Sequence, residues 1–428
     1  MSAAGPKRGF AIFRHRDFTL FVVARFSAVV AVQMIVIAVG WQVYHLTGRV
    51  LDLGLIGLSQ FLPFVCLALV AGHTADRYDR RNVMRVCLTL YLACALLLLT
   101  FARLGTVSVL PIFGVLGLLG VTRAFFTPAT QSYLPNLVPV AVFSSAVAFS
   151  SSAFQVAMIA GPSIGGLVYA AGQSASGAGP RGAGGAEWVY GVAALLVLLG
   201  LVMMTLIGHR RAPEGRAVVT WHTLLEGLRF IWRRKTVLGA ISLDLFAVLF
   251  GGATALLPAY TRDVLHAGPE VFGALRAAPG VGAVAMAVFL AFHPIRRHVG
   301  PTMFGGVAVF GAAVVVFGLT THFWVAICAL VILGGGDMIS VFVRTLLVQL
   351  ETPDEIRGRV SAVNSVCIGA SNELGEFESG VTAAWLGLVP SIVLGGALTL
   401  LVAVVWARGF FPALWRLQEF ESLKDPRG

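Results

Sequence analysis

Long apolar stretches alternate with short polar ones along the whole chain. Twelve of the apolar stretches are long enough to cross the roughly 30 Å hydrocarbon core of a bilayer as helices. Helices are expected because a helix satisfies its own backbone polar groups where water is absent. The predicted spans are residues 18–46, 51–73, 82–103, 107–128, 142–171, 188–208, 237–261, 270–292, 303–321, 323–349, 360–386 and 389–411. The pattern therefore predicts an all-α membrane protein with twelve transmembrane helices.

The composition supports a membrane protein and argues against several other classes. Hydrophobic residues make up 57% of the chain and charged residues only 12%, whereas soluble domains average about 45–50% and about 25%. The net charge of +11 is spread in clusters between apolar stretches, so we expect no nucleic-acid partner. The five cysteines show neither a disulfide framework nor metal spacing. With no nucleophile or phosphate-binding motif either, the chain is predicted not to be an enzyme and to hold no metal or cofactor.

The positions of the basic residues indicate how the chain is oriented. Cytoplasmic loops of membrane proteins carry an excess of Lys and Arg. If both termini are cytoplasmic, 23 of the 31 basic residues lie in cytoplasmic segments, 4 in outer loops and 4 within spans. We therefore expect both the N- and the C-terminus in the cytoplasm.

The two halves of the chain resemble each other. Tyr44 and Tyr260 lie 216 residues apart, and so do the pairs Arg80-Arg81 and Arg296-Arg297. A nearly constant shift indicates a duplicated six-helix unit, as in many transporters. The predicted parts are an N-terminal six-helix bundle (1–208), a cytoplasmic linker (209–236), a C-terminal six-helix bundle (237–411) and a cytoplasmic tail (412–428). Apolar residues at helical spacing beside a basic cluster predict an amphipathic helix in the linker, lying on the inner leaflet.

The most charged loop lies between the second and third spans, at residues 71–84. Asp76 stands at the end of the second span, where its carboxylate could cap the N-terminus of a neighbouring helix and interact favourably with the helix dipole. The loop resembles the signature between helices 2 and 3 of the major facilitator superfamily, which latches the two halves of those transporters on the cytoplasmic side. The resemblance assigns a gating latch to Gly72, Asp76, Arg77, Arg80 and Arg81.

A stretch of the fifth span resembles the antiporter signature of the same superfamily. It contains Gly161, Pro162, Gly165 and Gly166. Proline removes a helix hydrogen bond, and the glycines permit a kink and a close helix contact. Ordinary packing of membrane helices is the alternative interpretation. The resemblance implies export rather than uptake.

Charged and polar side chains inside the spans are the strongest functional signal, because each is costly unless it is paired or hydrated. Asp337 and Arg344 share a helix face, and Glu373 and Glu376 are close enough for one carboxylate to increase the proton affinity of the other. A structural ion pair or a helix-end charge is the alternative, above all for Arg25, Arg276 and Asp244. The candidate substrate- or proton-coupling residues are Arg25, Gln33, Arg123, Asp244, Asp337, Arg344, Asn372, Glu373 and Glu376.

Residues 14–18, 41–48, 226–232 and 370–380 are similar to one branch of the superfamily, which contains enterobactin-exporter-like siderophore exporters and macrolide efflux proteins. The resemblance implies two pseudo-symmetric six-helix bundles, alternating access and a place in the bacterial inner (cytoplasmic) membrane. It also implies a role in proton coupling for Arg123.

Taken together, the sequence predicts a secondary active transporter that exports a small metabolite, such as a siderophore or a drug. We expect it to be a monomer that uses the proton gradient in place of a cofactor. Its expected partners are the small-molecule substrate and the lipid bilayer. The alternatives are proton-coupled uptake of a metabolite or iron chelate, lysophospholipid transport, and a sensor that transports nothing.

Overall fold

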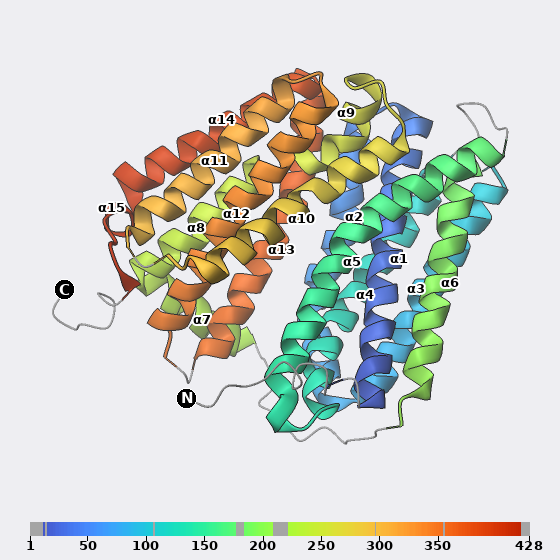
Figure 1. Ribbon diagram of the computed structural model, residues 1–428, viewed down its shortest axis with the longest axis horizontal. Coiled ribbons are helices and arrows are strands. Elements are labelled where there is room, and N and C mark those ends of the chain that lie inside the picture. The colour runs from blue at the N-terminus through green and yellow to red at the C-terminus, as the bar shows by residue number, and fades with distance from the viewer. Residues whose placement is uncertain are drawn as a thin grey trace. The chain divides into compact units, whose positions relative to one another are not determined.

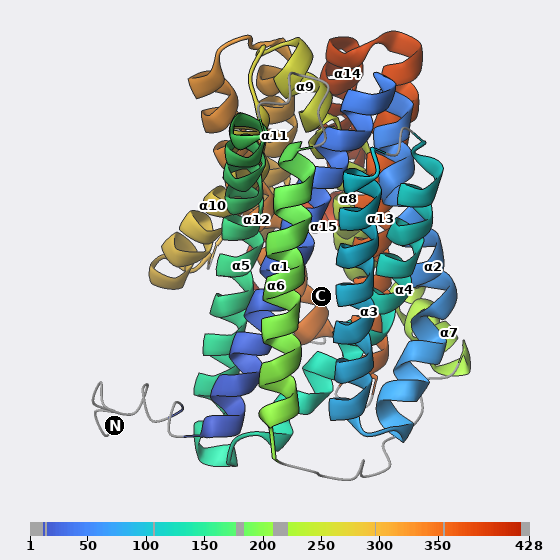
Figure 2. The same cartoon turned by 90° about the vertical axis from the view of Figure 1, so that its right-hand side faces the viewer.

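The computed structural model describes residue 12 and residues 15–105, 108–176, 184–208, 221–295, 297–353 and 356–420. These residues form helices and no β-strand (Figures 1 and 2). The beginning of the predicted linker, residues 209–220, and the end of the predicted tail, residues 421–428, lie outside the described residues.

The chain divides into two compact units. The first contains residues 1–46 and 59–218, and the second contains residues 47–58 and 219–428. The beginning of the second long helix therefore groups with the second unit, although the rest of that helix belongs to the first.

The first unit is built from long helices that pack side by side. Helix α3 contacts both α4 and α6, and α5 also contacts α6. The helices are α1 (Arg16–Thr47), α2 (Val50–Arg77), α3 (Arg80–Arg103), α4 (Leu110–Tyr133), α5 (Val140–Ala175) and α6 (Gly184–Leu206).

The second unit combines long helices with several short ones. Helix α12 contacts α10 and α11, and α11 contacts α14, as Figure 1 also shows. The helices are α7 (Trp221–Arg233), α8 (Lys235–Phe250), α9 (Leu257–Asp263), α10 (Pro269–Phe292), α11 (Val299–Leu319), α12 (Phe323–Glu351), α13 (Arg357–Leu386), α14 (Leu388–Val405) and α15 (Pro412–Trp415).

Within the described residues, eleven segments are long and apolar enough to cross a membrane. They correspond to eleven of the twelve predicted spans. The remaining prediction, residues 360–386, coincides with α13, which at 30 residues is long enough to span but is less apolar. Its charged residues lower its hydropathy: Arg357, Arg359, Glu373, Glu376 and Glu378. The all-α membrane fold is confirmed.

The predicted span at 237–261 is not one unbroken helix. Helix α8 ends at the Gly251-Gly252 pair, and a short 3₁₀ turn leads into α9. The backbone of Gly375 in α13 lies so close to Gly252 that a Cβ atom there would collide with it. Because a broken helix frees backbone groups, these need new partners inside a membrane. At the end of α8 the backbone nitrogen of Gly251 still donates to the carbonyl of Ala247, which also accepts from the hydroxyl of Thr399 at 3.1 Å.

Glycines allow α10 and α12 to pack backbone against backbone. A Cβ atom on Gly282 would collide with the carbonyl oxygen of Val331, and one on Gly334 would collide with that of Pro279. Small residues at such contacts let membrane helices approach closely enough for extensive van der Waals packing.

Substitution of Gly334 with Ala should therefore destabilise the second unit by about 1–3 kcal/mol, because the added methyl group forces α10 and α12 apart. Unfolding of the purified protein in detergent measures the loss. Gly305→Ala is the control, since an added Cβ on Gly305 of α11 meets no atom within 4 Å. Equal stability of the two variants would contradict the close α10–α12 contact.

Candidate functional site

A buried ion pair joins α8 to α12 in the second unit. Atom Nη1 of Arg344 lies 2.5 Å from Oδ2 of Asp244, and their side chains are only 3% and 5% exposed. Asp244 in α8 and Arg344 in α12 are both buried, so both helices direct these charges inward. Two charges buried this deeply are tolerated only as partners of each other.

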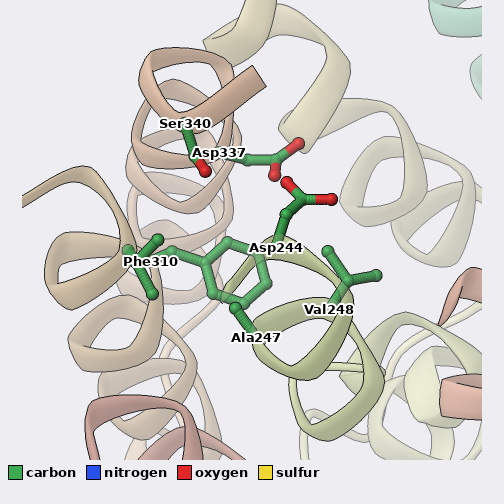
Figure 3. Close-up of a pocket in the computed structure, with 7 residues that line it drawn as sticks. Asp244, Ala247, Val248, Phe310, Asp337 and Ser340 are labelled. Atoms are coloured by element: carbon green, nitrogen blue, oxygen red, sulfur yellow. The ribbon is translucent and has the colours of Figure 1, made fainter. Parts of the chain in front are cut away.

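Asp337 lies beside this pair. It occupies α12 about two turns before Arg344 and lines a small cavity together with Asp244 and Ser340. Figure 3 shows the carboxyl groups of Asp244 and Asp337 directed toward each other across the cavity. The free space is about that of one water molecule. The remaining walls are apolar side chains of Ala247, Val248, Val307 and Phe310.

Two further polar atoms in this region have unused hydrogen-bonding capacity. The hydroxyl of Ser340 and Nε of Arg344 are buried and have no hydrogen-bond partner among the described residues. A buried polar atom without a partner costs about 1–3 kcal/mol. The cluster Asp244–Asp337–Ser340–Arg344, called the acidic cluster below, can therefore bond an additional polar group or proton.

A second ion pair joins α10 to α13. Atom Nη2 of Arg276 lies 3.1 Å from Oε1 of Glu376, and the side chains are 25% and 21% exposed. The sequence grouped Glu376 with Glu373 on the same helix, whereas the structure gives it a cationic partner from another helix. Glu373 is buried in α13. Asn372 is exposed and donates from Nδ2 to the carbonyl of Ile368 at 2.8 Å.

In the first unit, two candidate arginines lie over aromatic rings. The guanidinium of Arg25 in α1 is 4.9 Å from the ring centre of Phe154 in α5, and it donates to the hydroxyl of Ser150 at 2.9 Å. The guanidinium of Arg123 in α4 is 5.0 Å from the ring centre of Phe64 in α2. Such cation–π contacts stabilise a guanidinium against a ring of a neighbouring helix.

The antiporter-like residues bring α5 against α1 near Gln33. A Cβ atom on Gly161 would lie 2.6 Å from Cβ of Gln33, so glycine is needed for this approach. Gly165 and Gly166 are also buried, and α5 continues as a helix through Pro162. These glycines therefore act in helix packing, and their predicted role in a transport kink stays a prediction.

The charged loop is tied into the first unit by its arginines. Asp79 caps α3 by accepting from the backbone nitrogen of Arg81 at 3.0 Å. The guanidinium of Arg80 donates to the carbonyl of Ser132 at 3.0 Å, and that of Arg81 donates to the carbonyl of Thr205 at 2.9 Å. Both carbonyls lie at helix C-termini, where carbonyl groups lack helical partners and cations are favoured.

The other predicted latch residues lie at the end of α2. Arg77 is exposed, and Gly72 has open space where a Cβ atom would be added. The side chain of Asp76 lies outside the described part of the structure. The gating latch therefore stays a prediction.

Three residues of these arrangements were absent from the sequence-based site: Asp79, Arg276 and Ser340. An Asp directly before a helix is a recognisable N-cap signal. Arg276 stood out as a charge inside a span, but its partner lies 100 residues away in the sequence. Ser340 carried no signal in the sequence, because serine is common in membrane helices. Its place in the site is apparent only from its position beside the cavity.

The family model MFS_3, described as a transmembrane secretion effector, matches residues 7–425. The chain belongs to the major facilitator superfamily. Among superfamily members, the multidrug efflux pump Tap of Mycolicibacterium fortuitum is 26% identical over 411 residues, covering 91% of this chain and 94% of that protein. The enterobactin exporter EntS of Escherichia coli O1:K1 / APEC is 25% identical over 398 residues, covering 91% of each.

Solved superfamily structures have the same fold. A bacterial homologue of the human lysosomal transporter Spinster superposes with a TM-score of 0.71 at 14% identity, covering 96% of this chain and 99% of that one. A D-xylose-proton symporter gives 0.69 at 14% identity, covering 93% and 98%. The predicted superfamily branch and the prediction of a transporter rather than an enzyme are confirmed. The chain is a multi-pass inner-membrane transporter of the efflux type that acts on a small molecule.

Replacing Arg344 with Met should lower the free energy of unfolding by about 3–5 kcal/mol, because Asp244 would keep a buried charge without its partner. The double variant Arg344→Met with Asp244→Leu should recover most of the loss. Denaturant unfolding in detergent measures both changes. As a control, Arg297→Gln in the exposed pair with Glu419 should cost less than about 1 kcal/mol. An equal loss in the single and double variants would contradict the assigned pair.

Proposed function

We propose that this transporter exports a small amphiphilic or polar molecule, of the siderophore or drug class, in exchange for protons by alternating access. The direction is supported by the relatives: Tap is a multidrug efflux pump and EntS is an enterobactin exporter. The proposal includes a monomer with both termini in the cytoplasm, powered by the proton gradient without a cofactor.

The charge balance of the acidic cluster carries the proposal of proton coupling. Asp244 and Asp337 line one cavity, and Arg344, which pairs with Asp244, is the cation of the cluster. When both carboxyl groups are ionised, one negative charge is in excess in a partly buried region lined mostly by apolar side chains. A proton on either carboxyl group removes the excess. Because burying an unbalanced charge is costly, the cluster favours binding one proton.

Protonation would change how α8 and α12 are held together. With Asp337 neutral, Asp244 keeps Arg344 to itself, as in the observed 2.5 Å pair. With Asp337 ionised, two carboxylates compete for the guanidinium, whose Nε has no partner among the described residues. A local change of charge can thus bias the packing of two helices, which is what a coupled conformational switch requires.

The remaining candidate residues are proposed to contact the substrate. The guanidinium groups of Arg25 and Arg123 lie over aromatic rings, and Glu376 is partly exposed beside Arg276. Polar groups of both signs suit a substrate that is itself polar or amphiphilic. Gln33 in the first unit, and Asn372 and Glu373 in the second, are proposed as further groups that hydrogen-bond the substrate.

A flux assay in proteoliposomes tests the coupling, with ethidium and enterobactin as probes. A pH gradient should drive a probe in the direction opposite to the protons. Asp337→Asn should reduce this gradient-driven flux to that of protein-free liposomes, because the cluster can no longer change its charge. Exchange of probe for probe without a gradient should persist in the variant. Asp263→Asn, a half-exposed carboxylate in α9, is the control and should leave both activities intact.

Other results of the flux assay would change the proposed direction, the proposed proton site or the proton coupling itself. Movement of the probe together with the protons would make the protein an importer. Loss of coupling in Glu376→Gln but not in Asp337→Asn would place the proton site on α13. A flux that ignores the pH gradient for both probes, despite probe exchange, would overturn proton coupling.

A further inference from the structure

Helix α7 packs one of its faces against other helices of the second unit. Ile231 is 2% exposed and lies in an apolar cluster with residues of α8, α12 and α13. A Cβ atom on Gly227, one turn earlier, would lie 2.8 Å from the backbone oxygen of Arg359 in α13. The side chain of Arg359 also forms an ion pair with Glu226. These contacts fix the orientation of α7 about its own axis.

The side of α7 that adjoins this packed face exposes large apolar side chains, since Leu228 and Trp232 each lie one residue, or about 100° around the helix, beyond Gly227 and Ile231. Leu228 is 45% exposed and Trp232 is 71% exposed. The two residues are one turn apart and therefore form a single stripe along the helix. Tryptophan is enriched where membrane meets water, because its ring is apolar and its N–H group is polar. The stripe is therefore suited to the boundary between lipid headgroups and acyl chains.

A basic stripe lies next to the apolar one. Arg229 and Arg233 are one turn apart and exposed, and Arg234 and Lys235 follow directly and are also exposed. Residues 229–235 thus hold four cations and no acidic residue. Long basic side chains extend their charge toward phosphate groups while their stems cover apolar surface.

The length of α7 excludes a spanning role. Its 13 residues reach only about 20 Å, which is less than the roughly 30 Å hydrocarbon core. An amphipathic helix of this length with a basic stripe beside an aromatic one lies in the plane of the interface.

We propose that α7 is a docking surface for anionic phospholipids of the bilayer, with the four cations of residues 229–235 on the lipid phosphates and Trp232 at the headgroup boundary. Charge complementarity selects this occupant, because a zwitterionic bilayer satisfies the apolar stripe but leaves the cations without counter-charges. Since α7 is bound to Arg359, docking also anchors the beginning of α13. The proposal is independent of proton coupling and of the transported substrate.

The test uses the full-length protein in detergent and measures its thermal stability with added phosphatidylglycerol or phosphatidylcholine. Phosphatidylglycerol should raise the unfolding temperature more than phosphatidylcholine does. The variant Arg229→Gln, Arg233→Gln, Arg234→Gln should lose this preference, with an apparent affinity for phosphatidylglycerol that falls about fivefold for each arginine removed. The control is Arg408→Gln with Arg416→Gln, which removes two exposed arginines outside α7 and should keep the preference.

Further measurements distinguish binding of anionic phospholipid from binding of a zwitterionic lipid or a soluble phosphate. Substitution of Arg229, Arg233 and Arg234 with lysine should retain the preference, which shows whether loss in the glutamine variant reflects charge or misfolding. Trp232→Ala should weaken binding of both lipids, whereas Trp385→Ala, at an exposed site on α13, should not. The preference should fade in about 1 M salt, where the screening length is only about 3 Å. An equal effect of soluble glycerol phosphate, or equal stabilisation of the wild type by both lipids at low salt, would overturn the proposal.

Discussion

A charge inside an apolar helix bundle has to find its stabilising partner within the protein, and this constraint shapes both units. Arg344 and Asp244 meet this requirement with a direct ion pair, and Arg276 and Glu376 do the same closer to solvent. Arg25 and Arg123 use aromatic rings of neighbouring helices. An aromatic ring stabilises a cation less than a carboxylate does. The two units thus use different groups for these four arginines: aromatic rings in the first unit and carboxylates in the second.

Close backbone contacts determine where these charges meet. The Gly251-Gly252 pair ends α8 where Gly375 of α13 approaches, and this end lies two turns after Asp244. On the other side of the cluster, Gly334 packs against α10 one turn before Asp337. The glycines thus fix the two helices that carry the acidic cluster. Bulky residues at these positions would separate the charges that the bundle has to pair.

Much of the fold was predictable from the sequence, because hydrophobic length alone identifies membrane helices. The exceptions have clear physical causes. Helix α13 is less apolar than the other long helices because it contains Glu373, Glu376 and Glu378. The break after α8 depends on a contact with a helix more than 100 residues away in the sequence. The candidate residues were found as single charges, but their pairing was not, since Asp244 and Arg344 lie 100 residues apart. Pairing is a property of tertiary packing and leaves no local pattern.

The Arg276–Glu376 and Asp244–Arg344 pairs of the second unit differ in their charge balance. Arg276 and Glu376 balance each other one to one, so this pair is neutral when both groups are ionised and gains nothing from a proton. The acidic cluster has two carboxyl groups for one guanidinium, so it is balanced only after it binds one more positive charge. The cavity between the carboxyl groups is about the size of one water molecule, which suits a proton carried by water better than a bulky organic cation. The one-to-one pair is therefore suited to positioning, and the unbalanced cluster to exchange.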